Sequence, residues 1–158
     1  MSWAGNQLGL EMATNPPAVF DFAYTVQPDE IDDQQHVHNL RYLQWTLWAA
    51  HRHTEACGWD SARELRERKI GWVVRSHDVA YRNPAFAGDQ LIVRTWVADV
   101  THVASRRKYV IYRPADQSIL CRVETRWAFV DLAHRKAIAI PDDVLRLLQP
   151  VSKPPPLP

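Results

Sequence analysis

Cysteine is scarce in this chain of 158 residues, and long apolar runs are absent from it. The two cysteines, Cys57 and Cys121, form neither a CxxC pair nor a zinc-finger spacing. We therefore expect both to be reduced and to behave as small apolar residues. No window approaches the roughly 20 apolar residues of a membrane span, and residues 1–17 lack the basic start and apolar run of a signal peptide. These absences predict a cytoplasmic protein that does not bind a membrane.

Charge of one sign is also lacking, because the formal net charge is only +1. The chain therefore has no broad basic field of the kind that non-specific nucleic-acid binding needs. No GxSxG, P-loop or GxGxxG sequence occurs, so serine-hydrolase, nucleotide-triphosphate and dinucleotide functions have no support. With 46% apolar and 23% charged residues, the composition is that of an ordinary globular domain.

The chain divides into three parts by composition. Residues 1–17 mix glycine, asparagine and proline with isolated apolar residues, which predicts a flexible N-terminal arm. Residues 18–149 carry all the periodic patterns and form a single domain by length. Residues 150–158 are a proline-rich tail for which we expect no packed partner. An alternative role for the tail is docking into an aromatic groove of another protein.

One long apolar helix is the main feature of the first half of the domain. A strand over residues 19–26 precedes it, and the helix is expected over residues 38–57, with Gly58 at its C-terminal cap. Apolar residues occupy two adjacent faces of its first half, which predicts that this half is buried nearly all round. Residues 59–68 are charged and predict a short helix on the outside.

Strands dominate the second half of the domain. They are expected over residues 71–82, 90–100, 105–113 and 119–130, and a closing helix over residues 142–148. In the last strand apolar residues alternate with Arg122, Glu124 and Arg126, so one face is apolar and the other charged. The predicted class is α+β, with one antiparallel sheet curled around a single long central helix.

The junction between a polar turn and the long helix carries the functional signal. Asp32, His36, Asn39 and Tyr42 occur there with a spacing that resembles the motif Asp-x-Asp-x-x-Gly-His-Val-Asn-Asn-x-x-Tyr. This motif belongs to the acyl-CoA thioesterases of the 4-hydroxybenzoyl-CoA thioesterase-like group. The resemblance extends to the Tyr-x-x-Pro and Gly-Asp of VAYRNPAFAGDQLIV and to the Ile-Pro that precedes the closing helix, and it implies the hot-dog fold over about residues 19–148.

The chain departs from the motif at three positions: Glu30 replaces the first aspartate, Gln35 the glycine and His38 the first asparagine. Glu30 either raises the pKa of Asp32 by repulsion or points to solvent. His38 at an asparagine position affects the contact with the substrate oxygen, or lines the pocket and tunes the choice of substrate.

Three residues are candidates for catalysis. By resemblance Asp32 is the carboxylate that attacks a thioester carbonyl or activates water, and backbone N–H groups near His38 and Asn39 stabilise the developing oxyanion. The residues alone favour a helix-capping or helix-complementing role for Asp32, and for Asn39 the alternative is an N-cap. His36 either acts directly in the site or ties the turn together by hydrogen bonds.

Substrate-binding candidates come from the helix start and from a basic cluster. His38 and Tyr42 are placed to line an acyl pocket, although Tyr42 is more typical of a packing residue. The cluster of Arg82, Ser105, Arg106 and Arg107 resembles the strand residues of a partner subunit that often meet coenzyme A phosphates in this family, since arginine binds phosphate through its fork of donors. A solvated strand edge is the alternative. The histidines on the helix lack a ligand spacing, so no metal site is expected.

The resemblance implies an acyl-CoA thioesterase that releases a carboxylic acid and free coenzyme A. Coenzyme A is then part of the substrate, and no separate cofactor is expected. A homodimer or homotetramer is implied, because the sheet must cover its edge and the family's site lies between subunits. Two alternatives remain at this point: a hot-dog dehydratase of 3-hydroxyacyl thioesters, and a non-catalytic module that binds acyl thioesters or assists assembly.

Overall fold

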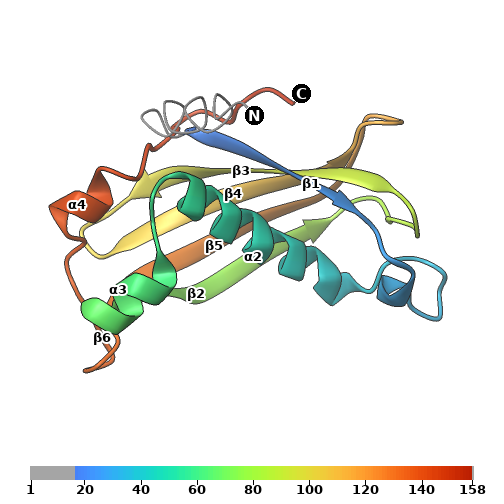
Figure 1. Ribbon diagram of the computed structural model, residues 1–158. Helices are drawn as coiled ribbons and strands as arrows, with labels where there is room; N and C mark the ends of the chain where they lie inside the picture. The colour runs from blue at the N-terminus through green and yellow to red at the C-terminus, as the bar shows by residue number, and fades with distance from the viewer. Residues whose placement is uncertain (1–16, 158) are drawn as a thin grey trace, which may run out of the picture.

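The computed structural model describes residues 17–157 and contains one antiparallel sheet with a long helix across one of its faces (Figure 1). The strands are β1 (Val19–Thr25), β2 (Ile70–Tyr81), β3 (Gln90–Val100), β4 (Ala104–Arg113), β5 (Ser118–Asp131) and β6 (Lys136–Ala137). The helices are η2 (Pro28–Glu30, a 3-10 turn), α2 (Asn39–Ala56), α3 (Ser61–Glu67) and α4 (Asp142–Leu145).

The order of strands in the sheet is β1-β3-β4-β5-β2, and the short β6 also pairs with β5. All these pairs are antiparallel. Register shifts in β2 and β3 mark β-bulges, which increase the local twist and help the sheet to curl around α2. The predicted α+β hot-dog architecture, with an antiparallel sheet curled around one long helix, is confirmed.

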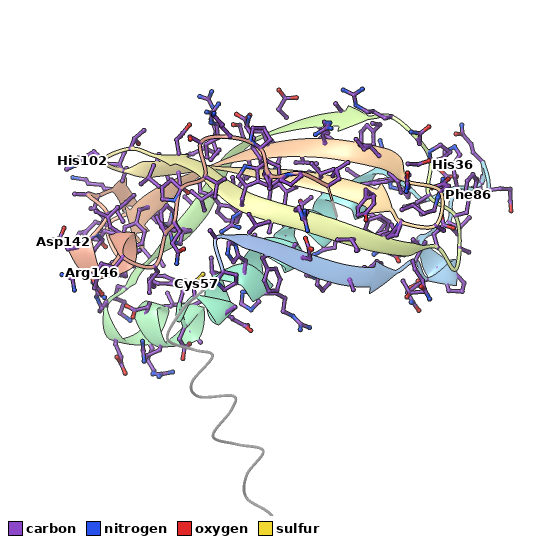
Figure 2. All side chains as sticks on the ribbon, turned by 90° about the horizontal axis from the view of Figure 1, so that it is seen from above. His36, Cys57, Phe86, His102, Asp142 and Arg146 are labelled. Atoms are coloured by element: carbon purple, nitrogen blue, oxygen red, sulfur yellow. The ribbon has the colours of Figure 1, made fainter. Side chains whose placement is uncertain are left out.

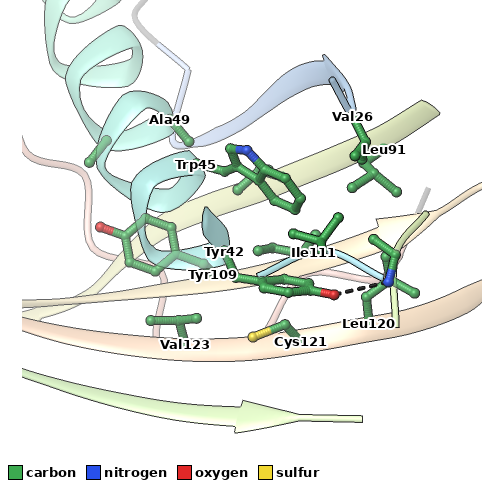
Figure 3. Close-up of a cluster of buried hydrophobic side chains, with 14 residues drawn as sticks. Val26, Tyr42, Trp45, Ala49, Leu91, Tyr109, Ile111, Leu120, Cys121 and Val123 are labelled. Carbon is green, nitrogen blue, oxygen red and sulfur yellow. Dashed lines mark hydrogen bonds between the residues drawn. The ribbon is translucent and has the colours of Figure 1, made fainter. Parts of the chain in front are cut away.

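The alternation in β5 explains which side of the sheet is covered. Cys121, Val123 and Thr125 are buried beneath α2, whereas Arg122 and Arg126 lie on the opposite, exposed face. Across this core, α2 contributes its buried residues Tyr42, Trp45, Thr46, Ala49, Ala50 and His53. Figure 3 shows Tyr42, Trp45 and Ala49 among them. Period-two patterning in the strand and helical patterning in α2 thus meet in one apolar layer.

The first half of α2 is not buried all round, so that prediction is wrong. Leu40 is 61% exposed and Trp48 is 39% exposed, whereas Trp45 is fully buried. A single sheet covers one side of a helix, and within residues 17–157 no second layer lies over the other side. The long apolar helix therefore leaves part of its apolar surface uncovered in the single chain.

The C-terminal end of α2 follows a recognisable capping rule. The helix ends at Ala56, and Gly58 has φ +100°, a left-handed conformation that glycine adopts without a Cβ penalty.

The closing helix, α4, is shorter than predicted and ends at Leu145, because the chain then tightens into i+3 turns ahead of Pro150. A residue before proline disfavours the helical region.

The C-terminal tail packs against the outer face of the sheet, contrary to expectation. The Val151 N–H donates to the Val97 carbonyl at 2.8 Å, and the Arg94 guanidinium donates to the Pro156 carbonyl. Val151 also packs against the cluster of Trp96, Val110 and Tyr112. The predicted N-terminal arm lies outside the described residues apart from Pro17. Among residues 17–157 no helix combines the length and apolarity that crossing a membrane requires.

Candidate active site

A tight turn over residues 31–38 leads the chain from η2 into α2. The Asp32 N–H donates to the His36 carbonyl at 2.9 Å, and the Gln35 N–H donates to the Asp32 carbonyl at 3.0 Å. Val37, which is buried, donates its N–H to the Ala85 carbonyl at 2.9 Å and anchors the turn to the loop after β2. The turn is therefore held in place largely by backbone hydrogen bonds.

Gln35 occupies the position of the family's glycine, and its backbone explains why glycine is usual there. Its φ is +69°, in the left-handed region where a side chain costs about 1–2 kcal/mol. The side chain is exposed, so it gains little packing in return. The departure from the motif keeps the turn and introduces backbone strain.

Replacing Gln35 by glycine should raise the free energy of unfolding by about 0.5–1 kcal/mol. Relief of the left-handed strain exceeds the extra chain entropy that glycine has when unfolded. Urea denaturation of the two proteins measures the difference. Gln34→Gly is the matched control: it has no positive φ to relieve and should be neutral or destabilising. Equal stabilisation by both variants would contradict this account.

Asp32 lies at the turn with one carboxylate oxygen engaged. Its Oδ1 accepts the Gln34 N–H at 2.8 Å and lies 3.8 Å from His36 Nδ1. No donor from residues 17–157 is recorded on Oδ2, and the side chain is 26% exposed. Asp32 therefore organises its own turn through one oxygen and leaves the other for chemistry. His36 lies 3.5 Å from the Val37 carbonyl through the same Nδ1, a contact at the limit of a hydrogen bond.

The helix cap is His38, not Asp32 or Asn39. Its Nδ1 accepts the Leu40 N–H at 3.2 Å, and its own N–H donates to the Glu30 carbonyl at 2.9 Å. The amides of His38 and Leu40 are therefore blocked by the chain itself, and the expectation that the His38 N–H serves the substrate is wrong. Within residues 17–157 the Asn39 N–H has no acceptor. It is the first amide of α2, where the helix dipole is positive.

Asp32 and Asn39 line one open cleft of about 560 Å³. Its walls come from the turn, from the start of α2 and from the end of β2, and they comprise Asp32, Asp33, Gln34, His36, Val37, His38, Asn39, Tyr42, Tyr81, Arg82, Asn83 and Pro84. As far as residues 17–157 show, the cleft thus holds a carboxylate with an open oxygen and a helix-start amide without an acceptor. These are the two groups that attack on a carbonyl requires.

Two tyrosines fix the walls of the cleft. The Tyr81 hydroxyl donates to the Asn39 carbonyl at 2.8 Å, and the Tyr42 hydroxyl accepts the Ala85 N–H at 2.9 Å (Figure 3). Burial raises the pKa of both phenols, so both hydroxyls keep their protons. The Tyr42 and Tyr81 rings also meet edge to face at 5.4 Å. Tyr81 was not a sequence candidate, although it is the tyrosine of the Tyr-x-x-Pro segment.

Glu30 is a buried anchor, so the expectation that it either repels Asp32 or points to solvent misses its main role. Its carboxylate accepts the Tyr24 hydroxyl at 2.6 Å, the Trp45 indole N–H at 2.8 Å and the Gln27 N–H at 2.9 Å. Burial, followed by the Glu30 carboxylate, raises the pKa of Tyr24 to about 12. Glu30 therefore ties β1, the turn and α2 together directly beside Asp32.

The predicted basic cluster is split between opposite ends of the sheet. Arg82 follows β2 and lines the cleft, whereas Ser105 pairs with Trp127 at the far end of β4. In Figure 2, His36 of the turn and His102, just before β4, mark these two ends. Arg106 is on the outer face, paired with Asp99 and Glu124. The grouping of Arg82 with Ser105, Arg106 and Arg107 is therefore wrong within one chain.

Arg107 faces inward and is only 4% exposed, which contradicts its expected contact with coenzyme A phosphates at the surface. Its Nη1 donates to His53 Nδ1 at 2.8 Å and to Thr95 Oγ1 at 3.2 Å. Since an arginine only donates, His53 Nδ1 accepts, and the ring proton is on Nε2, which donates to the Pro17 carbonyl at 2.6 Å. Burial, followed by the charge of Arg107, lowers the pKa of His53 to about 4.

This lowered pKa predicts a loss of stability in mild acid. Between pH 6.5 and pH 4, His53 is protonated in the unfolded chain but stays neutral in the folded protein. The free energy of unfolding therefore falls as the pH falls through this window. The loss should be about 2 kcal/mol between pH 7 and pH 4.5. Urea denaturation at both pH values measures it, and His53→Gln should remove this part of the pH dependence. An unchanged pH dependence in the variant would refute the assignment.

No metal-like grouping of three or more His, Cys, Asp or Glu side chains occurs within residues 17–157. The other helix histidine, His51, pairs with Glu55 one turn along α2, and both are exposed. The histidines of α2 thus pair with neighbouring side chains and the Pro17 carbonyl.

A single antiparallel sheet curled around one long helix defines a protein with the hot-dog fold. The profile of the Thioesterase-like superfamily matches residues 26–148. The chain belongs to this family, and the resemblance seen in its sequence is thereby confirmed.

Relatives in this family act on different thioesters. The chain is 31% identical over 93 residues to the chloroplastic acyl-[acyl-carrier-protein] hydrolase of Cuphea viscosissima. The matched residues make up 59% of this chain and 23% of the relative. It is 23% identical over 126 residues to the long-chain acyl-CoA thioesterase FadM of Escherichia coli, covering 78% of this chain and 92% of FadM. This chain thus spans about a quarter of the plant enzyme.

A solved structure shows the same fold at low identity. The 1,4-dihydroxy-2-naphthoyl-CoA thioesterase of Synechocystis superimposes with a TM-score of 0.78 at 17% identity, covering 86% of this chain and 99% of that one.

Proposed function

We propose that the protein is an acyl-CoA thioesterase whose reaction takes place in the cleft at the start of α2. One observation carries the proposal: the open carboxylate oxygen of Asp32 and the Asn39 N–H, which has no acceptor within residues 17–157, line the same cleft. Membership of the thioesterase-like family supports it, as does the similarity to an acyl-CoA thioesterase. The cytoplasmic location stays a prediction.

In this mechanism the thioester carbonyl oxygen accepts the Asn39 N–H, so the charge that develops on it meets the positive end of α2. Asp32 then acts by one of two routes. It attacks the carbonyl carbon, giving a mixed anhydride that water opens, or it takes the proton of a water that attacks instead. Both routes break the C–S bond and release coenzyme A and a carboxylic acid. A thiolate is a good leaving group and needs little acid catalysis.

The remaining site residues have supporting roles in the proposal. His36, 3.8 Å from Asp32, orients the carboxylate. His38 and Tyr42 line the cleft beside the acyl group. Arg82 is the arginine at the cleft and is our candidate for a coenzyme A phosphate contact. Ser105 and Arg106 reach this cleft only if a second subunit brings them there.

We propose a homodimer formed along β2. Among the described residues this strand of 12 residues pairs only with β5, so its other edge has unsatisfied backbone groups. Exposed apolar residues flank that edge: Leu40 on α2, Leu65 on α3, and Val74 and Tyr81 on β2. An antiparallel pair of β2 strands would bring opposite ends of two sheets together, and with them the cleft of one subunit and β4 of the other. A further pairing of dimers gives the tetramer.

Charges placed at this edge should separate the subunits. Leu40→Glu combined with Val74→Lys should shift the chain from dimer to monomer in sedimentation equilibrium at micromolar concentration. Glutamate is favourable in the first turn of a helix, so the substitution at Leu40 should not destabilise α2. Leu145→Glu on α4, another exposed leucine, is the control and should remain a dimer. A wild-type protein that sediments as a monomer and still turns over would exclude the dimer.

Two other functions are separated from hydrolysis by one assay. A hot-dog dehydratase needs a histidine and acid pair in its site, and the pair on α2, His51 and Glu55, is exposed and lies outside the cleft that contains Asp32. A binding module would bind acyl thioesters without turnover. Thiol release from a panel of acyl-CoA esters of increasing chain length tests the proposal. Hydrolysis of at least one ester is expected, and binding without thiol release from any would favour the module.

A further inference from the structure

A small cavity lies between the C-terminal half of α2 and the elements β3, β4 and α4. Its volume is about 20 Å³, and its walls include His53, Cys57, Val97 and Arg107. A cavity of at least about 10–15 Å³ can hold one water-sized particle. This one therefore has space for a single such particle and no more. It shares no lining residue with the cleft that contains Asp32.

Arg107 differs from the other arginines of β3 and β4 in its partners. Those arginines pair with carboxylates: Arg94 with Asp21, Arg106 with Asp99 and Glu124, and Arg113 with Asp89 and Asp116. Arg107 is only 4% exposed, yet within residues 17–157 no carboxylate lies within 4.0 Å of its guanidinium. Its Nη1 donates to His53 and Thr95, and no acceptor from the same range is recorded for Nη2 or Nε. A buried charge is costly unless an opposite charge meets it.

The titratable groups beside Arg107 do not supply the missing negative charge. Arginine stays protonated in proteins, so Arg107 is a cation at pH 7 although burial lowers its pKa. His53 is neutral, because burial, followed by the charge of Arg107, lowers its pKa to about 4. Cys57 is a neutral thiol, because burial raises its pKa. The described walls of the cavity therefore carry a net positive charge.

We propose that this cavity binds one chloride ion, held by the Nη2 and Nε groups of Arg107. A halide is a single-atom anion little larger than water, so it suits the volume, whereas sulfate, phosphate and organic acids are too large. The bound ion gives the guanidinium an opposite charge and leaves its bonds to His53 and Thr95 in place. It therefore stabilises the contact of α2 with β3 and β4. The site does not depend on thioesterase activity.

The dependence of stability on chloride tests the proposal. The full chain is unfolded with urea at pH 7 in sodium chloride and in sodium gluconate of equal ionic strength, because gluconate cannot enter the cavity. A ligand that binds only the folded state stabilises it. Chloride should therefore raise the urea midpoint, and the increase should saturate as chloride replaces gluconate. Equal midpoints in the two salts would overturn the proposal.

Binding itself is measured by the broadening of the chloride NMR resonance in the presence of the protein. The wild type should broaden the resonance, and bromide should reverse the broadening by competition, whereas gluconate and sulfate should not. Broadening that sulfate reverses as effectively as bromide does would indicate a site open to larger anions, and would also overturn the proposal.

Two variants locate the ion. Arg107→Met removes the charge, and Val97→Leu fills the cavity from the residue paired with Arg107 on β3 while keeping that charge. Each should abolish both the broadening and the chloride-dependent rise in the urea midpoint. Arg106→Met, which removes an arginine of the outer face, is the matched control and should retain both effects. Asp32→Asn should also retain them, which separates this site from the cleft.

If Arg107→Met fails to fold, Val97→Leu decides. Broadening that persists in either variant, once that variant is shown to be folded, would place the chloride elsewhere on the protein and overturn the proposal.

Discussion

Replacing Asp32 by asparagine lowers kcat for thioester hydrolysis by about 10²–10⁴-fold, the range typical for loss of a catalytic acid or base. The amide keeps an oxygen for the Gln34 N–H, so the turn retains its hydrogen bond, and only the negative charge is lost. KM should change by no more than a few-fold, because the lost interaction acts in the transition state. Steady-state thiol release with the ester that the wild type prefers measures both constants.

The matched control for this variant is Asp29→Asn. Asp29 is an exposed carboxylate three residues away, on η2 and outside the cleft. Its amide variant should keep kcat within about two-fold of the wild type, with the same unfolding transition. A fall in kcat of similar size in both variants would show that net charge at the turn matters and that Asp32 has no specific role.

Truncating Glu30 to alanine should lower the free energy of unfolding by about 3–5 kcal/mol. The variant leaves the Trp45 indole N–H, the Tyr24 hydroxyl and the Gln27 N–H without their common acceptor, at a site that is nearly closed to solvent. Loss of one partner of buried charged hydrogen bonds has costs of this size. Because Glu30 also accepts the His38 N–H through its carbonyl, the turn that holds Asp32 should loosen.

Chemical denaturation and thiol release measured on the same samples test both effects. Glu30→Gln retains the shape and one acceptor oxygen, so it should lose less stability than Glu30→Ala. Asp29→Ala, the exposed neighbour, should stay within about 0.5 kcal/mol of the wild type. Wild-type stability in Glu30→Ala would mean that the buried carboxylate does not anchor the turn.

The parts of the molecule that sequence reasoning predicted well depend on local pattern. The alternation in β5 and the capping glycine at Gly58 gave strands and helix ends close to those observed, because periodicity and capping act over a few residues. The turn and the helix start are equally local, which is why Asp32, Asn39 and Tyr42 were expected together and line one cleft. Their catalytic roles remain predictions.

The parts that were missed depend on contacts between distant segments. Arg107 and His53 are 54 residues apart, and their hydrogen bond requires both the register of β4 and the docking of α2. Glu30 is buried only because Tyr24 and Trp45 converge on it from β1 and α2. The contact of Val151 with β3 is likewise a tertiary one. The charge pattern along the sequence grouped Arg82 with Ser105, because it does not show that the sheet places these residues at opposite ends.

A structure of Asp32→Asn with a bound acyl-CoA ester tests the central claim most directly. The claim predicts a thioester carbonyl oxygen at hydrogen-bond distance from the Asn39 N–H, with the side chain at position 32 facing the carbonyl carbon or a water beside it. An ester bound with its carbonyl away from the opening turn of α2, while the protein still hydrolyses that ester, would contradict it.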